Sequence, residues 1–182
     1  MSKIELIVSI LGAFLAMIIA IFFTSTMIEA EYEPMIIAST GASAMLIFGF
    51  PHSSVSKPWN LVGGHLVSAF VGVSCYQLFS NELLAASLTI PLAMLLMHVC
   101  RCMHPPGGAT AITAVVGGSA IHSLGYMFLL LPVFFNSIIL LSMLWLPAHS
   151  GMKILLHLKL MIISTPIKLL FTYFNIPRIL SR

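Results

Sequence analysis

The stretch LIVSILGAFLAMIIAIFFTSTMI, from Leu6 to Ile28, contains no charged side chain. An α-helix needs about 20 apolar residues to cross the hydrocarbon core of a bilayer. The apolar part of a cleavable signal peptide is shorter, about 7–15 residues. We therefore predict that this stretch is a retained membrane span.

The whole chain has the same apolar character. Its residues are 59% hydrophobic and 7% charged, whereas a soluble domain contains about 25% charged residues. Inside lipid, the backbone must satisfy its own hydrogen bonds, which only helices and closed barrels achieve. The short alternating segments of barrel strands are absent. The sequence thus predicts an all-α, polytopic transmembrane helical bundle, with the lipid bilayer as partner and no nucleic acid.

Apolar segments recur along the chain, and we number them one to six. They are Leu6–Ile28, Met35–Phe50, Leu61–Ser80, Leu83–Cys100, Pro105–Ile121 and Ser123–Leu146. Segments one, three, four and six have about the length that a bilayer requires. Segments two and five are short and rich in Gly, Ala, Ser and Thr.

The charges between the segments favour six crossings. With six crossings and a cytoplasmic N-terminus, all 8 basic residues lie inside, as the positive-inside rule requires. These are Lys3, Lys57, Arg101, Lys153, Lys159, Lys168, Arg178 and Arg182, while Glu29, Glu31, Glu33 and Glu82 lie outside. If segments two and five re-entered without crossing, Lys57 and Arg101 would move outside. We expect a multi-pass protein of the cell inner (plasma) membrane with both termini cytoplasmic.

The pattern changes after Pro147, which divides the chain into residues 1–147 and 148–182. The second part mixes Lys153, Lys159 and Lys168 with apolar residues. Buried lysines in a seventh span would be costly. A basic amphipathic tail that lies at the membrane interface is the favoured interpretation.

Segments two and five also resemble each other. Gly41-Ala42-Ser43-Ala44 matches Gly108-Ala109-Thr110-Ala111, and His-Ser follows both, at residues 52–53 and 122–123. The order long, short, long then occurs twice, as in the 3+3 inverted repeats of many transporters. A chance match of small residues, which line close helix contacts in membranes, is the alternative.

A helix start is predicted at His104-Pro105-Pro106-Gly107-Gly108-Ala109-Thr110. Proline suits the first turn of a helix, and glycine permits close approach of the backbone. The free N–H groups of such a start attract anions. Thr40-Gly41-Ala42-Ser43 offers a similar start, so we expect both positive ends to face one cavity near the midplane. Packing faces made of small residues are the alternative for both stretches.

Other residues are assigned supporting roles. Arg101 and His104 are expected to assist an anion from the inner side, although Arg101 also fits a topology anchor and His104 a bond to a backbone carbonyl. Gly63, Gly64 and His65 are expected to pack against the Pro-Pro break. His98 and His104 with Cys100 or Cys102 match no zinc spacing, so neither a metal nor another cofactor is expected.

Several of these motifs occur together in one known family. They are IASTGASA at residues 37–44, Pro51-His52-Ser53, residues 60–66, Arg101, and His104 to Ala111. From about Pro34 to Pro132 the chain resembles the HPP family of membrane proteins, named for the His-Pro-Pro motif. That family is usually described with about four spans, and plastid and cyanobacterial members are associated with nitrite transport. The resemblance implies a small anion, with nitrite first, as substrate.

The leading hypothesis is a non-enzymatic transporter or channel for a small monovalent anion. The expected binding residues are Thr40, Gly41, Ser43, Arg101, His104, Gly107, Gly108 and Thr110, with Pro105, Pro106, Gly63, Gly64 and His65 as the structural motif. A membrane enzyme with His and Cys ligands and a structural subunit without transport are the alternatives. A homo-oligomer is left open.

Overall fold

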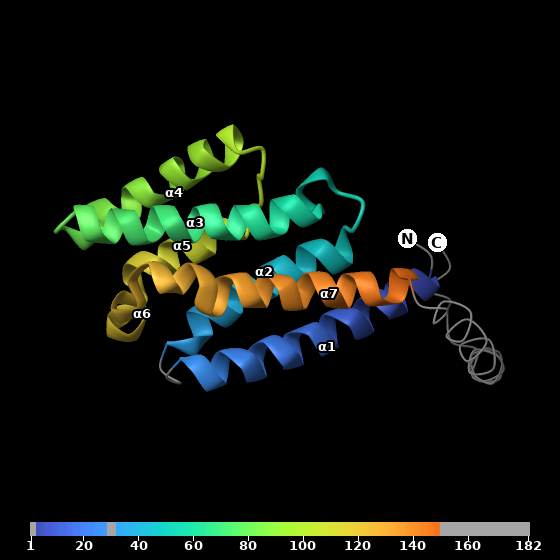
Figure 1. Cartoon of the computed structure of the whole chain (residues 1–182). Helices are drawn as coiled ribbons and strands as arrows, with labels where there is room; N and C mark the ends of the chain where they lie inside the picture. The colour runs from blue at the N-terminus through green and yellow to red at the C-terminus, as the bar shows by residue number, and fades with distance from the viewer. Residues whose placement is uncertain (1–2, 29–31, 150–182) are drawn as a thin grey trace, which may run out of the picture.

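The computed structural model describes residues 3–28 and 32–149, with side chains up to Leu144. All regular structure within these residues is helical, which confirms the predicted all-α membrane bundle (Figure 1). The α-helices are α1 (Lys3–Met27), α2 (Glu33–Gly49), α3 (Pro58–Leu78), α4 (Glu82–Val99), α5 (Gly107–Val116), α6 (Gly118–Leu124) and α7 (Phe135–His149). Shorter helical turns are η1 (Ser54–Ser56), η2 (Gly125–Leu129) and η3 (Leu130–Phe134). The tail 150–182 lies outside the described residues.

The predicted division into four long and two short segments is confirmed. Four stretches are long and apolar enough to cross a membrane, namely Lys3–Met27, Pro58–Leu78, Glu82–Val99 and Gly118–Leu144. Two apolar helices are shorter, Glu33–Gly49 and Gly107–Val116. The six helical segments therefore include the four spans that the family resemblance implied.

The predicted boundaries of segments five and six are wrong. The chain bends at Gly118, whose φ is +80°, so segment five is divided into α5 and α6. The long stretch that follows is interrupted at Leu131, whose φ of −121° and ψ of 111° are not helical. Glycine adopts positive φ without steric cost, which explains why the first bend falls there.

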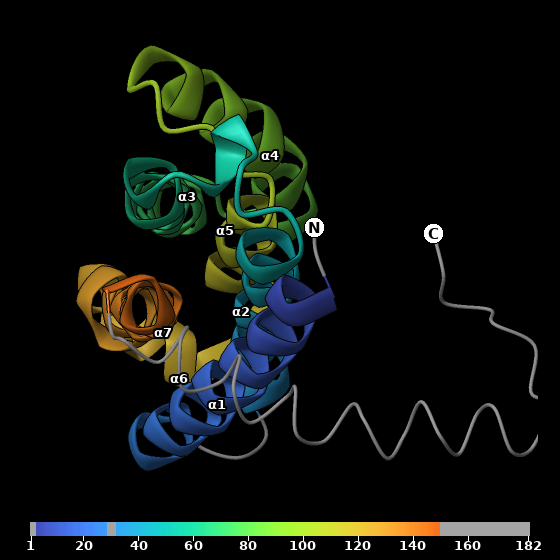
Figure 2. The same cartoon turned by 90° about the vertical axis from the view of Figure 1, so that its right-hand side faces the viewer.

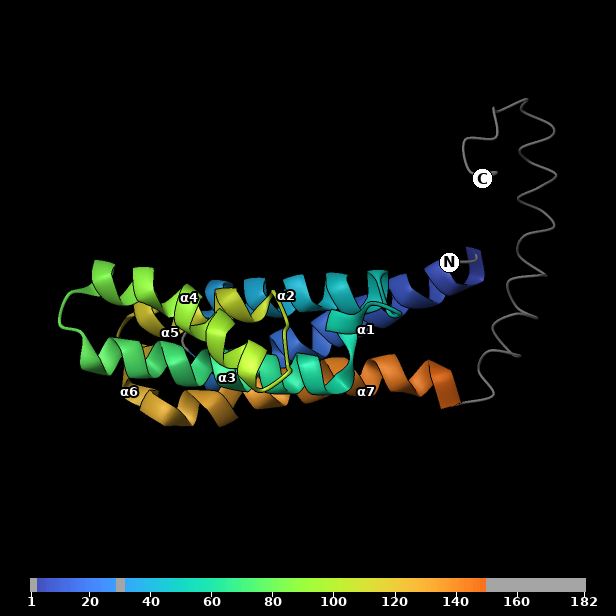
Figure 3. The same ribbon diagram turned by 90° about the horizontal axis from the view of Figure 1, so that it is seen from above.

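Charged residues gather at opposite ends of the bundle. The α1–α2 and α3–α4 connections lie at one end, and the α2–α3 connection lies at the other with the start of α1 (Figures 1 and 3). Glu33 and Glu82 begin α2 and α4, whereas Lys57 directly precedes α3. Trp59 Nε1 donates to the Cys100 carbonyl at 3.1 Å, which brings Arg101 to the same end as Lys57. This separation is the one that six alternating crossings require.

Helix α5 is enclosed by other helices. Seen nearly along the bundle, it lies among α2, α3 and α4 (Figure 2). Its 10 residues correspond to about 15 Å, or half a bilayer core. Cys102 and His104 precede it and lie against Gly63 and Gly64 of α3. The glycine pair therefore packs against the segment that leads into the Pro-Pro break.

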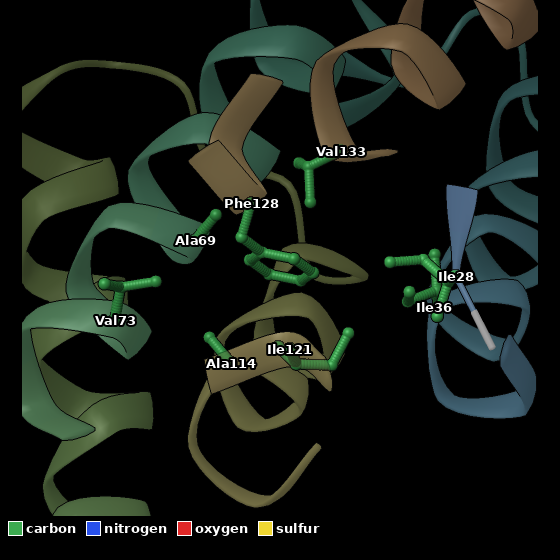
Figure 4. Packing of buried hydrophobic residues seen from close by; sticks show 8 residues of the cluster. All are labelled: Ile28, Ile36, Ala69, Val73, Ala114, Ile121, Phe128 and Val133. Carbon is green, nitrogen blue, oxygen red and sulfur yellow. The ribbon is translucent and has the colours of Figure 1, made fainter. Parts of the chain in front are cut away.

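A cluster of buried apolar side chains closes the bundle toward its acidic end. Phe128 is 1% exposed and lies at the centre of this cluster (Figure 4). The surrounding residues are Ile28, Ile36, Ala69, Val73, Ala114, Ile121 and Val133. One aromatic ring thus joins α2, α3, α5 and α6.

Truncation of this ring is expected to destabilise the fold. Phe128→Ala leaves a cavity that the surrounding helices fill only partly, so the free energy of unfolding should fall by about 3 kcal/mol. Phe22→Ala is the matched control, because the Phe22 ring is 71% exposed. Thermal unfolding in detergent measures both variants, and equal effects would contradict the central role of Phe128.

Candidate functional site

A small polar cavity lies inside the bundle. Its volume is about 10 Å³, which is room for about one water molecule. It is lined by Ile36, Ser39, Thr40, His65, Thr110, Thr113, Phe128, Val133, Asn136, Ser137 and Leu140. Hydroxyl, imidazole and amide groups are costly to bury in a membrane interior, which makes their concentration here a functional signal.

Two buried histidines form a hydrogen-bonded network beside the cavity. His65 lies 2.7 Å from the Thr110 hydroxyl through Nδ1 and 2.6 Å from the Ser43 hydroxyl through Nε2. The Ser43 hydroxyl also lies 3.1 Å from Nε2 of His104, and Nδ1 of His104 lies 2.9 Å from the Val55 carbonyl oxygen. The network therefore joins α2, α3 and α5 to the α2–α3 connection.

The partners determine where the protons lie when both rings are neutral. A carbonyl oxygen only accepts, so His104 donates from Nδ1 to Val55 and its Nε2 accepts from Ser43. Ser43 has one hydrogen, so His65 donates to it from Nε2. Nδ1 of His65 then accepts from the Thr110 hydroxyl. With these assignments, each hydrogen bond of the network from Val55 to Thr110 has one donor and one acceptor.

Asn136 of α7 is the second polar centre at the cavity. Its Nδ2 donates to the Thr24 hydroxyl at 2.9 Å and to the Thr40 hydroxyl at 3.4 Å. Its Oδ1 is buried and has no hydrogen-bond partner. An unpaired buried polar atom costs about 1–3 kcal/mol, so this amide has capacity for a further ligand.

The predicted helix start at Thr40 is wrong. Helix α2 begins at Glu33, so Thr40 and Ser43 lie in its middle. The Thr40 hydroxyl donates to the carbonyl of Ile36 at 2.9 Å. Hydroxyl groups that bond to their own helix in this way let a stretch rich in Thr and Ser remain helical.

The two short helices also do not direct their positive ends into one cavity. The Tyr32 hydroxyl, just before α2, lies 3.2 Å from the Ser119 hydroxyl, which follows α5. The N-terminal end of α2 therefore meets the C-terminal end of α5. Ser43, in the middle of α2, instead meets His104 in the connection that precedes α5.

The predicted helix start at Gly107 is correct, but its first N–H groups are already bonded. The N–H groups of Gly107, Gly108 and Ala109 donate to the carbonyls three residues earlier, at 2.9, 3.0 and 3.1 Å. Such tight turns are common in the first turn of a helix. These backbone groups therefore have no free hydrogen for an anion.

The remaining predicted residues lie away from the cavity. A Cβ atom on Gly41 would lie 3.7 Å from Met17 of α1, and one on Gly108 would lie 3.4 Å from Ile90 of α4. Gly107 lies against Ser68 of α3. Arg101 is exposed in the α4–α5 connection. Of the predicted binding residues, the structure brings together Thr40, Ser43, His104 and Thr110.

Sequence reasoning missed several residues of the site. His65 was expected only to support packing, yet it lies between the cavity and Ser43. Ser39, Thr113, Asn136 and Ser137 were not predicted to line it. A signal existed for Asn136, because an amide within an apolar membrane segment marks a polar contact between helices.

Within residues 3–28 and 32–149, no three His, Cys, Asp or Glu side chains are grouped so that they could hold a metal ion. Cys75 and Cys102 are buried free thiols, and Cys100 is an exposed one.

Comparison with known proteins identifies the family. The model of the HPP transmembrane region matches residues 1–150. A transmembrane protein of Dictyostelium discoideum is 33% identical over 129 residues, which cover 69% of this chain and 45% of the relative. A second transmembrane protein of the same organism is 35% identical over 129 residues, covering 69% of this chain and 41% of the relative. The chain thus spans less than half the length of these relatives, and no solved structure matches it. The chain belongs to the HPP family of transmembrane proteins.

Proposed function

We propose that the chain is a transporter or channel for a small monovalent anion, with nitrite as the first candidate. The observation that supports this proposal is the cavity, where hydroxyl groups of α2 and α5 and the Asn136 amide converge in an apolar bundle. The family resemblance independently suggests nitrite. An anion-binding site needs hydrogen donors, so the orientation of the amide is important.

The Asn136 amide can supply a donor to the cavity. The oxygen and nitrogen of an amide are nearly the same in shape, and their assignment follows from the hydrogen bonds around them. Turned over, the amide accepts from the Thr24 hydroxyl through Oδ1, over the same 2.9 Å. Nδ2 then becomes the group without a partner, and its hydrogen is available to an anion.

The size of the cavity favours small ions. At about 10 Å³ it has room for about one water molecule, so a triatomic ion requires the helices around it to separate slightly. Larger ions require a larger separation, and divalent ions require a larger loss of hydration. The site should therefore prefer nitrite or a similar small ion to sulfate.

The orientation in the membrane and the binding residues are part of the same proposal. By the positive-inside rule, the end with Lys57 faces the cytoplasm, in the inner (plasma) membrane, with both termini on that side. The residues proposed to bind are Thr40 and Thr110, predicted from the sequence, together with Ser39, Thr113, His65 and Asn136. Transport by this site requires no enzymatic activity and no cofactor.

Flux through liposomes tests the function. The purified full chain, reconstituted into liposomes, is expected to take up nitrite with saturation, at a rate above that of protein-free liposomes. Sulfate uptake is expected to equal the protein-free rate. If nitrite, nitrate, formate and chloride all move at the protein-free rate, the proposed function is wrong.

A further inference from the structure

An anion in the cavity would be a buried negative charge, with no positively charged side chain beside it among the residues that the structure describes. Among residues 3–28 and 32–144, no Lys or Arg lines the cavity, and His65 is the only titratable residue that does. Lys57 and Arg101 are both exposed outside it. An isolated charge in an apolar interior is strongly disfavoured unless an opposite charge accompanies it. The protein must therefore supply a positive charge from within the network, or leave the anion uncompensated.

The histidine network has the hydrogen-bond partners for one more proton. With His104 protonated, its Nδ1–H still donates to Val55 and its Nε2–H donates to Ser43. Ser43 then turns its own hydrogen to the carbonyl of Ser39, 3.1 Å away. Every donor again has an acceptor at the same heavy-atom positions, because a hydroxyl accepts two hydrogen bonds and donates one.

The added proton can also reside on His65. His65 then donates from Nε2 to Ser43 and from Nδ1 to Thr110. The Thr110 hydroxyl no longer donates to the ring, so its hydrogen becomes available to the cavity that Thr110 lines. Ser43 can pass the proton to His104 by accepting the hydrogen from Nε2 of His65 and giving its own to Nε2 of His104. His65 is then neutral, with its remaining hydrogen on Nδ1 toward Thr110.

We infer that the His65–Ser43–His104 network takes up one proton when the cavity binds an anion, so that anion and proton move together. This inference rests on the proposed function. The protonated network supplies the missing positive charge and, through Thr110, a further donor for the anion. By linkage, the anion then raises the affinity for the proton and the proton raises the affinity for the anion by the same factor.

The surroundings of the two rings contain no competing ionic group among the described residues that contact them. Helix α2 presents the Ser39 carbonyl and the Ser43 hydroxyl, α5 presents Thr110, and the α2–α3 connection presents the Val55 carbonyl. The buried thiol of Cys102, two residues before His104, lies beside Gly63. Asn136 and Ser137 of α7 do not titrate.

The test is proton movement during nitrite flux. Wild-type proteoliposomes with a trapped pH indicator receive an inward nitrite gradient, at membrane potentials set by potassium and valinomycin. We expect about one proton to enter with each nitrite ion, since the network accommodates one added proton. Paired movement of opposite charges is electroneutral, so the flux should not respond to the potential. Protein-free liposomes give the leak of nitrous acid to be subtracted.

Histidine variants locate the proton. His65→Gln and His104→Gln are expected to lose the protein-dependent proton entry together with at least about 90% of the nitrite flux, because their side chains cannot take the charge. His98→Gln is the matched control, since His98 is exposed on α4. Thermal unfolding checks that each variant is folded. If a variant does not fold, the response of the wild-type nitrite flux to the membrane potential tests the coupling instead.

The outcomes separate the two proposals. Nitrite flux that follows the membrane potential without proton entry overturns the coupling and leaves the proposed function standing. Proton entry at the wild-type rate in a folded His65→Gln or His104→Gln variant also overturns the coupling. Absence of protein-dependent flux for every anion tested overturns the proposed function and the coupling with it.

Discussion

The Asn136→Leu variant is expected to move nitrite about 10- to 100-fold more slowly than the wild-type protein, because a hydrogen bond to a charged ligand is worth about 1.5–3 kcal/mol. Leucine has the same number of side-chain heavy atoms as asparagine, with the same branching, and suits a membrane helix. It removes the amide that lines the cavity and has an unpaired atom. The Thr24 hydroxyl, which loses its partner, can bond to a carbonyl of its own helix. The initial rate of nitrite uptake into proteoliposomes measures the effect.

The matched control for this variant lies on the same helix. Ser142 of α7 is exposed, and its hydroxyl donates only to the carbonyl of Ile139. Ser142→Leu makes the same polar-to-apolar change away from the cavity and should leave the rate unchanged. An equal loss of flux in both variants, or no loss in Asn136→Leu, would show that the ion does not contact this amide.

The Gly64→Ala variant is expected to be clearly less stable than the wild-type protein. An added Cβ would lie 2.5 Å from Cβ of His104 and 2.9 Å from the carbonyl oxygen of Cys102. Neither neighbour is the end of a flexible side chain, so α3 and the α4–α5 connection must separate. Overpacking of this kind costs about 3 kcal/mol, and thermal unfolding in detergent measures it.

Gly41→Ala provides the comparison. Its added Cβ would lie 3.7 Å from the terminal methyl of Met17, which is ordinary van der Waals contact. Alanine also stabilises a helix interior relative to glycine by about 0.5–1 kcal/mol, so this variant should be at least as stable as the wild-type protein. Similar melting temperatures for the two variants would mean that α3 and the His104 segment do not pack as the structure has them.

The glycine pair changed by Gly64→Ala and the amide changed by Asn136→Leu differ in how far the sequence could predict them. The glycine pair at residues 63–64 lies in one motif with His65, and its packing beside the Pro-Pro break was predicted from the sequence. Asn136 was not predicted, because its partners are distant in sequence. It is 112 residues from Thr24 and 96 residues from Thr40, and no local pattern connects them.

The start of α2 shows why one prediction was wrong. Thr, Gly and Ser around residue 40 favour helix ends in water, because hydroxyl side chains compete for backbone groups and glycine loses much backbone entropy in a helix. In an apolar environment a hydroxyl can bond to a carbonyl one turn earlier, as the Thr40 hydroxyl does with the Ile36 carbonyl. The helix therefore begins at Glu33, where Pro34 supplies the usual first-turn proline.

The membrane spans follow from local sequence, because a helix satisfies its backbone within one segment and the hydropathy of that segment decides whether it can enter lipid. Hydropathy and segment length, from Leu6–Ile28 onward, were therefore sufficient to predict four long apolar stretches and two shorter ones. Tertiary structure decided which polar side chains meet. His65, Ser43 and His104 come from three separate parts of the chain, the last two being 61 residues apart. Their meeting depends on the rotation and packing of whole helices, and hydropathy contains no information about either.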